Sequence, residues 1–177
     1  FLAACSLYSR GIKLVDAIGV ETKEDQSVLA NMYSNRAVTY FREKCFDKCI
    51  EDCEKAIDLE PLLEKSWIRK WRGLMATGEF DEAYGFIRLA AKEVPTSKKI
   101  QQEYKNCQKE ADILQRVKAF MAKGDLTSCR EILEAIIDKC DNIVLFVYSA
   151  RVDITLGDLV QAREKINKAL RFNPNYV

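Results

Sequence analysis

A spacing of 34 residues between two prolines, Pro61 and Pro95, most constrains what this chain can fold into. Counting back 31 residues from each proline opens two units, at Ala30 and Glu64, which can be laid over one another. Each unit has an aromatic residue at position 4, small residues at positions 20 and 27, and the proline at position 32: Tyr33, Cys49, Ala56 and Pro61, then Trp67, Ala83, Ala90 and Pro95. A fixed period of this length indicates a repeat protein in which each unit is one supersecondary structure.

Three glycines mark further copies of a turn between two helices. Gly78, Gly124 and Gly157 are each followed by an acidic and then an apolar residue, and a small residue comes five positions after each glycine. The last unit closes at Pro174. Between Gly78 and Gly124 the spacing is 46 residues, so a segment is added to the period there. Apolar residues recur by threes and fours through that segment, which predicts one long helix from about Ser97 to Lys123.

The first residues fit the second half of a unit. Positions 17, 20, 24 and 27 are matched by Phe1, Ala4, Tyr8 and Gly11. This match predicts a second helix over residues 1 to about 18 without its partner first helix. We expect Gly19 to end that helix, and residues 20–26 to form a polar link to a helix that starts near Ser27. Because the chain also opens without Met, we expect it to be a piece of a longer protein.

These units resemble the tetratricopeptide repeat (TPR), whose pattern of Trp, Leu, Gly, Tyr, Ala, Phe and Pro describes a pair of antiparallel helices. The resemblance extends over nearly the whole chain. It implies an all-α fold, a right-handed superhelical solenoid of antiparallel helix pairs with an extended concave surface. The expected domains are 1–97, a half repeat plus two repeats, and 98–177, a long connecting helix plus two further repeats.

Charge and hydropathy exclude several classes of partner. Lys and Arg number 28 against 27 Asp and Glu, so the overall charge does not favour duplex DNA or an anionic bilayer. The chain has no apolar run close to the ~20 residues that a membrane-spanning helix needs, and it lacks the pattern of a secretory signal at its start. Seven cysteines, an odd number in a charged helical sequence, favour reduced thiols and a cytoplasmic location.

Three of the cysteines, Cys45, Cys49 and Cys53, recur at every fourth residue and would lie on one face of a helix. Such a face could suggest zinc. However, the chain has no His and no CxxC pair, and one straight helix cannot surround a zinc ion with four ligands. We therefore expect these cysteines to pack in the core, and we expect no metal and no cofactor.

The stretch EKSWIRKWRG, residues 64–73, combines basic residues with two tryptophans. At 100° per residue Trp67 and Trp71 share one sector, whereas Lys65, Arg69 and Arg72 gather on the opposite side. Proteins that bind single-stranded nucleic acid line one groove with both aromatic rings and cations. The separation of the two kinds of side chain therefore argues against nucleic acid and predicts that both tryptophans are buried.

The three cations occupy positions 2, 6 and 9 of their unit, on the side of the first helix that faces the concave surface in TPR arrays. They could be an ordinary solvated face. However, Asn35 lies at position 6 of the preceding unit, and an amide beside two cations suits a carboxylate. The equivalent positions of the later units, Ala111 and Gln115 and then Val144 and Tyr148, are neutral.

The combination of YSNRA and EKSWIRK resembles the two-carboxylate clamp of TPR cochaperones, which hold the C-terminal Glu-Glu-Val-Asp tails of heat-shock chaperones. That clamp has five positions, and Asn35, Lys65 and Arg69 match three of them. From the resemblance, we expect the helix that carries the other two to lie before Phe1. The resemblance thus implies weak tail binding or none for this chain alone, with a peptide site of Asn35, Lys65, Arg69 and Arg72.

The stretches IQQEYKNCQKE and MAKGDLTSCREILEAII are also similar to the middle of TPR-containing J-domain cochaperones. That likeness implies a J domain downstream in the parent protein. We expect none within this chain, because the required His-Pro-Asp tripeptide cannot occur without His.

An enzyme is not expected, because the chain lacks His, the usual general base, and every common catalytic motif. Glu51, Asp52 and Glu54 are expected on an exposed face of a helix. Two binding functions remain: a cochaperone module for acidic tails or client segments, and a general scaffold of a multiprotein complex.

Overall fold

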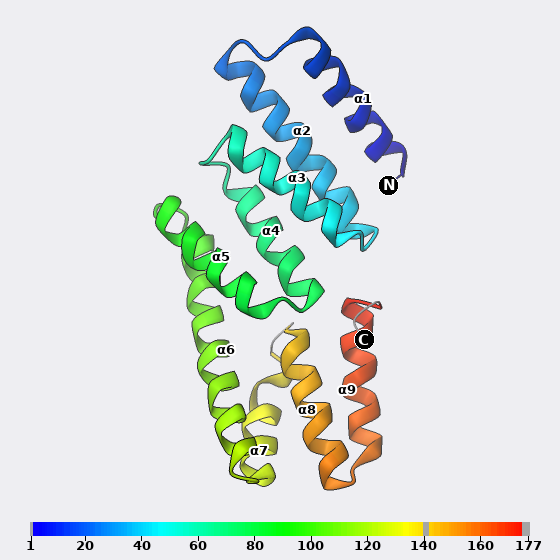
Figure 1. Cartoon of the computed structure of the whole chain (residues 1–177), viewed down its shortest axis with the longest axis vertical. Coiled ribbons are helices and arrows are strands. Elements are labelled where there is room, and N and C mark those ends of the chain that lie inside the picture. The colour runs from blue at the N-terminus through cyan, green and yellow to red at the C-terminus, as the bar shows by residue number, and fades with distance from the viewer. Residues whose placement is uncertain (1, 140–141, 175–177) are drawn as a thin grey trace. The chain divides into compact units, whose positions relative to one another are not determined.

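The computed structural model describes residues 2–139 and 142–174, so the prediction for Phe1 lies outside the described residues. Within these ranges the chain forms nine α-helices and no strand (Figure 1). The helices are α1 (Leu2–Ile18), α2 (Lys23–Arg42), α3 (Phe46–Leu59), α4 (Glu64–Thr77), α5 (Phe80–Glu93), α6 (Lys98–Ala122), α7 (Leu126–Ile137), α8 (Ile143–Leu156) and α9 (Leu159–Phe172). The predicted all-α fold is confirmed.

The helices pack into two compact units. Unit 1 comprises Phe1–Leu74 and Asp81–Tyr104, and unit 2 comprises Met75–Phe80 and Lys105–Val177. The border between the units falls inside α6, the predicted long helix, further along the chain than the expected border at residues 97 and 98. The division into domains 1–97 and 98–177 stays a prediction.

Glycines end the first helices where the repeat pattern requires a turn. Gly78, Gly124 and Gly157 have φ angles of 84°, 75° and 84°, in the left-handed region that L side chains rarely adopt. At the start of α2 the prediction was wrong, because the helix begins at Lys23 rather than near Ser27. The Thr22 hydroxyl accepts from the Asp25 amide, and the Asp25 carboxylate accepts from the Thr22 amide. This capping box starts the helix early.

Both tryptophans of α4 are buried, as predicted, with 4% of Trp67 and 9% of Trp71 exposed. The Trp67 indole Nε1 donates to the Pro61 carbonyl at 2.7 Å, and its ring stacks on Phe86 with 5.1 Å between the centroids. On the same helix, a Cβ added to Gly73 would lie 2.9 Å from Ile50 Cγ1, so α4 approaches α3 closely there. The aromatic residue at position 4 therefore connects α4 to the turn before it and to α5, the second helix of the same repeat.

The cysteine prediction holds for two of the three residues on α3. Cys49 and Cys53 are fully buried and form a cluster with Ala37 of α2. Cys45 is exposed, so its predicted core role was wrong. The reason is that α3 begins only at Phe46, which leaves Cys45 as the N-cap residue, before the helical face exists.

Each unit also buries an ion pair between two helices. In unit 1 the guanidinium of Arg36 holds both oxygens of Asp52 at 2.7 Å, and Asp52 is only 3% exposed. The prediction of an exposed Asp52 was therefore wrong, whereas Glu51 and Glu54 are exposed as expected. In unit 2 the ammonium of Lys165 lies 2.6 Å from Asp153, which is fully buried.

The core of unit 2 lies between α6, α7 and α8. Its buried members include Leu114 and Val117 of α6, Leu133 of α7, and Leu145 and Val152 of α8. The second helix of the last repeat, α9, packs beside α8 (Figure 1).

Candidate basic groove on the first helices of unit 1

The first helices α2 and α4 bring equivalent positions of two consecutive repeats into contact. Asn31 and Lys65 are both at position 2 of their repeats, and the Lys65 ammonium donates to the Asn31 side-chain carbonyl at 2.5 Å. The Asn31 amide nitrogen in turn donates to the Ser27 carbonyl at 2.7 Å. The two helices thus lie in register at this level, as the 34-residue period requires.

Arg69, one turn further along α4, is held by the same neighbouring helix. Its Nη1 donates to the Ser34 carbonyl at 2.8 Å and also to the Ser34 hydroxyl. Ser34 is fully buried, and its hydroxyl oxygen also accepts from the Ser66 hydroxyl at 2.9 Å. Burial lowers the pKa of Arg69 below its ordinary value. An arginine in such a site still stays protonated at neutral pH.

Asn35 follows Ser34 on α2 and is half-buried. Its amide makes no hydrogen bond to another described residue, so it is not in direct contact with either cation. Arg72 is exposed, and the structure places no described partner against it. Of the four residues expected at the peptide site, Lys65 and Arg69 are therefore fixed against α2, while Asn35 and Arg72 are not tied to them.

Neither Lys65 nor Arg69 forms an ion pair with a carboxylate in the described part of the chain. Both rest on neutral oxygen acceptors. A third cation of the same helix behaves differently: the Lys70 ammonium pairs with Glu54 at 2.6 Å and lies 4.6 Å from the centre of the Phe86 ring. The positive charge of Lys65 and Arg69 is thus uncompensated, whereas that of Lys70 is used within the fold.

Sequence reasoning missed Asn31 and Ser34, the two residues of α2 that hold the cations. Asn31 could have been found, because it lies 34 residues before Lys65 and occupies the same position of the preceding repeat. The role of Ser34 is not visible in the sequence, because its backbone carbonyl and its hydroxyl both bind Arg69 of another helix.

The equivalent groove positions of unit 2 belong to the packing of that unit. Ala111, Val144 and Tyr148 are partly buried against its core, and Gln115 is exposed. None of the four is charged.

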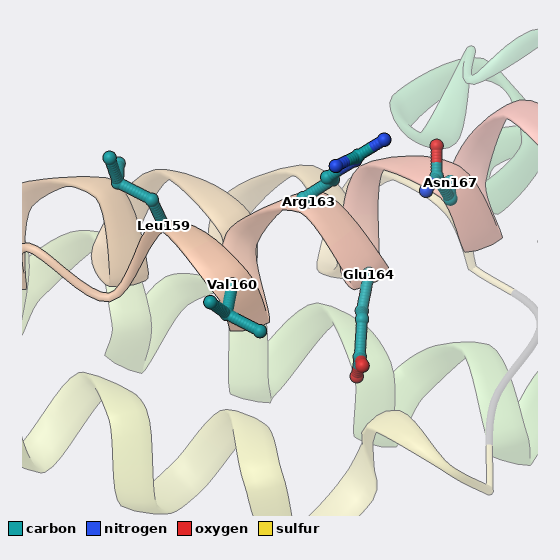
Figure 2. A pocket seen from close by; sticks show the side chains of 5 residues that line it. All are labelled: Leu159, Val160, Arg163, Glu164 and Asn167. Carbon is teal, nitrogen blue, oxygen red and sulfur yellow. The ribbon is translucent and has the colours of Figure 1, made fainter.

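A shallow hollow of about 500 Å³ lies on α9. Figure 2 shows its lining, with Leu159, Arg163 and Asn167 along one side of the helix and Val160 and Glu164 along the other. The hollow contains none of the expected site residues. Two of its five lining residues are aliphatic, and its one cation lies next to a carboxylate in the sequence.

No group of three or more His, Cys, Asp or Glu side chains between residues 2–139 and 142–174 is arranged to hold a metal ion. No helix in the same part of the chain is both long and apolar enough to cross a membrane.

The family model of the tetratricopeptide repeat matches residues 30–61, the unit that carries Asn31, Ser34 and Asn35. Residues 30–61 therefore match one tetratricopeptide repeat. The remaining units of this TPR array follow the same helix-turn-helix pattern in the structure.

Several curated relatives resemble part of the TPR array. Human "Sperm-associated antigen 1" is 34% identical over 84 residues, which are 48% of this chain and 9% of that protein. Rat "Mitochondrial import receptor subunit TOM34" is 36% identical over 81 residues, 46% of this chain and 25% of that protein. Yeast "Hsp70/Hsp90 co-chaperone CNS1" is 32% identical over 101 residues, 56% of this chain and 24% of that protein. The chain thus spans a quarter or less of the length of these relatives.

Solved structures share the fold. The P58(IPK) TPR domain matches 97% of this chain and 51% of its own chain, with a TM-score of 0.59 and 18% identity. The Hsp90 co-chaperone Cns1 from Saccharomyces cerevisiae matches 74% of this chain and 40% of its own, with a TM-score of 0.54 and 23% identity. At these identities the likeness concerns the fold of the TPR array.

Proposed function

We propose that this chain is the peptide-binding part of a cytosolic cochaperone, which takes the acidic C-terminal tail of a heat-shock chaperone into the groove of α2 and α4. Lys65 and Arg69 would bind the carboxylates, Asn35 would add a neutral donor, and Arg72 would lie at the edge. The observation that carries the proposal is the uncompensated charge of Lys65 and Arg69, which neutral acceptors hold in place.

The chemistry of the groove fits a chain end better than a folded surface. A C-terminus brings a main-chain carboxylate, and an acidic last residue brings a second one within a few ångströms. A guanidinium can bind one of them in a fork, and an ammonium can bind the other as a point charge. The printed name of the yeast relative, a co-chaperone of Hsp70 and Hsp90, agrees with this class of ligand.

The proposal is tested by titrating a fluorescent peptide that ends in Glu-Glu-Val-Asp into the purified chain. We expect weak saturable binding, with Kd in the range of about 10 µM to 1 mM, that weakens as salt is added. Lys65→Ala or Arg69→Ala should each weaken it by about tenfold or more, in line with the loss of a charge-assisted hydrogen bond. Arg72→Ala should have a smaller effect, because this side chain is exposed.

Lys70→Ala is the matched control, because it removes a cation from the same helix that already pairs with Glu54. Tail binding should survive that change. A second control is the same peptide with an amidated C-terminus, which should bind more weakly. If the unmodified peptide does not bind at about 1 mM, or if Lys70→Ala weakens binding as much as Lys65→Ala does, the tail-binding function is wrong. The chain would then be better described as a scaffold.

A further inference from the structure

We infer that Asn31 is a positioning residue, which holds the ammonium of Lys65 at the groove without neutralising it. This inference rests on the proposed function and extends it to a residue that does not itself bind the tail. It makes α2 a support for the cations of α4 as well as the source of Asn35.

Two hydrogen bonds fix the orientation of the Asn31 amide. Its nitrogen donates to the Ser27 carbonyl at 2.7 Å, so its oxygen is directed to Lys65 Nζ at 2.5 Å. Ser27 is itself fixed, because its hydroxyl donates to Glu60 at 3.0 Å. The acceptor for Lys65 is therefore part of a chain of hydrogen bonds that begins in the loop before α4.

The chemical type of the acceptor decides what Lys65 can do. An amide oxygen accepts one of the three protons of the ammonium and carries no formal charge. The two other lysines that are buried or half-buried among the described residues, Lys70 and Lys165, are held by carboxylates that cancel their charge. Lys65 alone among these three keeps both its full charge and free donors for a ligand.

Holding the side chain also limits its motion. A free lysine has a flexible four-carbon stem, and ordering it on binding costs conformational entropy. The hydrogen bond to Asn31 orders the ammonium before the ligand arrives. Arg69 is treated in the same way by the carbonyl and hydroxyl of Ser34, three residues along α2.

The inference is tested with the peptide ending in Glu-Glu-Val-Asp and two variants of Asn31. Asn31→Leu removes the acceptor, and we expect tail affinity to fall about threefold to tenfold, with little change in its salt dependence. Asn31→Asp keeps an acceptor but cancels the charge of Lys65. It should lower the affinity further and also reduce the salt dependence. Urea unfolding of both variants checks that the array stays folded.

A double-mutant cycle separates positioning from an unrelated structural effect. In a Lys65→Ala background, Asn31→Leu should cause no further loss of affinity. If it still lowers affinity, or if Asn31→Leu binds the peptide as tightly as the unmodified chain, the positioning role is wrong while the proposed function stands. If the unmodified chain fails to bind, the proposed function itself is wrong. Should Asn31→Leu not fold, Asn31→Ser is measured in the same cycle.

Discussion

Unit 1 and unit 2 place their charges differently on the same repeat. Both bury an ion pair between the two helices of a repeat, but the signs are reversed: Arg36 on the first helix with Asp52 on the second, then Asp153 on the first with Lys165 on the second. Only unit 1 also carries cations at groove positions 2 and 6 of a first helix, where unit 2 has Val144 and Tyr148.

This difference indicates which charged residues the fold requires. Asp52 and Lys165 both occupy position 23, so this interface accepts either sign as long as a partner faces it. The groove positions can be basic in one unit and neutral in the other, so the fold does not require charge there. Charge that is not needed for packing is the charge to test for ligand binding.

The largest effect is expected for the ion pair of Asp153 and Lys165, which is buried more deeply than the pair of Arg36 and Asp52 in unit 1. Asp153→Ala would leave the ammonium of Lys165, which is 7% exposed, without its carboxylate. We expect the free energy of unfolding to fall by about 3–5 kcal/mol, measured by urea denaturation. The paired change Asp153→Leu with Lys165→Met should recover most of the loss. A loss below about 1 kcal/mol for the single variant would show that the pair does not stabilise unit 2.

A smaller loss is expected for the pair of unit 1. After Asp52→Ala the guanidinium of Arg36 still has the Ser9 hydroxyl at 2.9 Å and lies near the rings of Tyr33 and Tyr40. We expect a loss of about 2 kcal/mol by the same measurement, which is typical of a charged hydrogen bond. If Asp52→Ala destabilises the chain as much as Asp153→Ala, the two pairs are equivalent in spite of their different surroundings.

An exchange of the residue at groove position 2 tests whether this position has the same structural role in both units. Val144→Lys should cost about 1–2 kcal/mol of folding stability, because Val144 packs against the core of unit 2. Lys65→Val, the reverse change at the equivalent position of unit 1, should change stability by less than about 0.5 kcal/mol. Equal losses in the two variants would mean that position 2 has the same structural role in both units.

The smallest effect is expected on the way folding stability depends on pH in acid. The hydrogen bonds of Asp125 with Ser128, and of Asp158 with Arg130, hold the pKa of both carboxyls of unit 2 below the usual 3.8. A lowered folded pKa stabilises the chain above pH 3.8, and that stabilisation is lost as pH falls through the folded value. Asp158→Asn should therefore make the acid side of the stability profile shallower. An unchanged profile would remove Asp158 from the acid response.

The repeat period predicted most of the fold, because each helix pair repeats one apolar pattern. It predicted the long helix α6 and the burial of Trp67 and Trp71. The start of α2 was missed because the capping box of Thr22 and Asp25 lies in a polar stretch that has no apolar period. The exposure of Cys45 was missed for a related reason, since a helical period does not show where the helix begins.

The site was predicted less completely than the fold. Lys65 and Arg69 were visible as cations on one face, but a sequence pattern does not give hydrogen-bond partners on another helix. The burial of Asp52 has the same explanation, because it depends on Arg36, 16 residues earlier. The clamp expectation for Asn35, Lys65, Arg69 and Arg72 stays a prediction.

The close approach of α4 to α3 at Gly73 links residues 73 and 50 in the evolution of the sequence. Since a methyl group at residue 73 would lie 2.9 Å from Ile50 Cγ1, an alanine there requires the Ile50 side chain to shift or to be replaced by a smaller one. Homologues should therefore vary at the two sites together, with a side chain that lacks a γ carbon, such as alanine, at 50 accompanying a loss of the glycine.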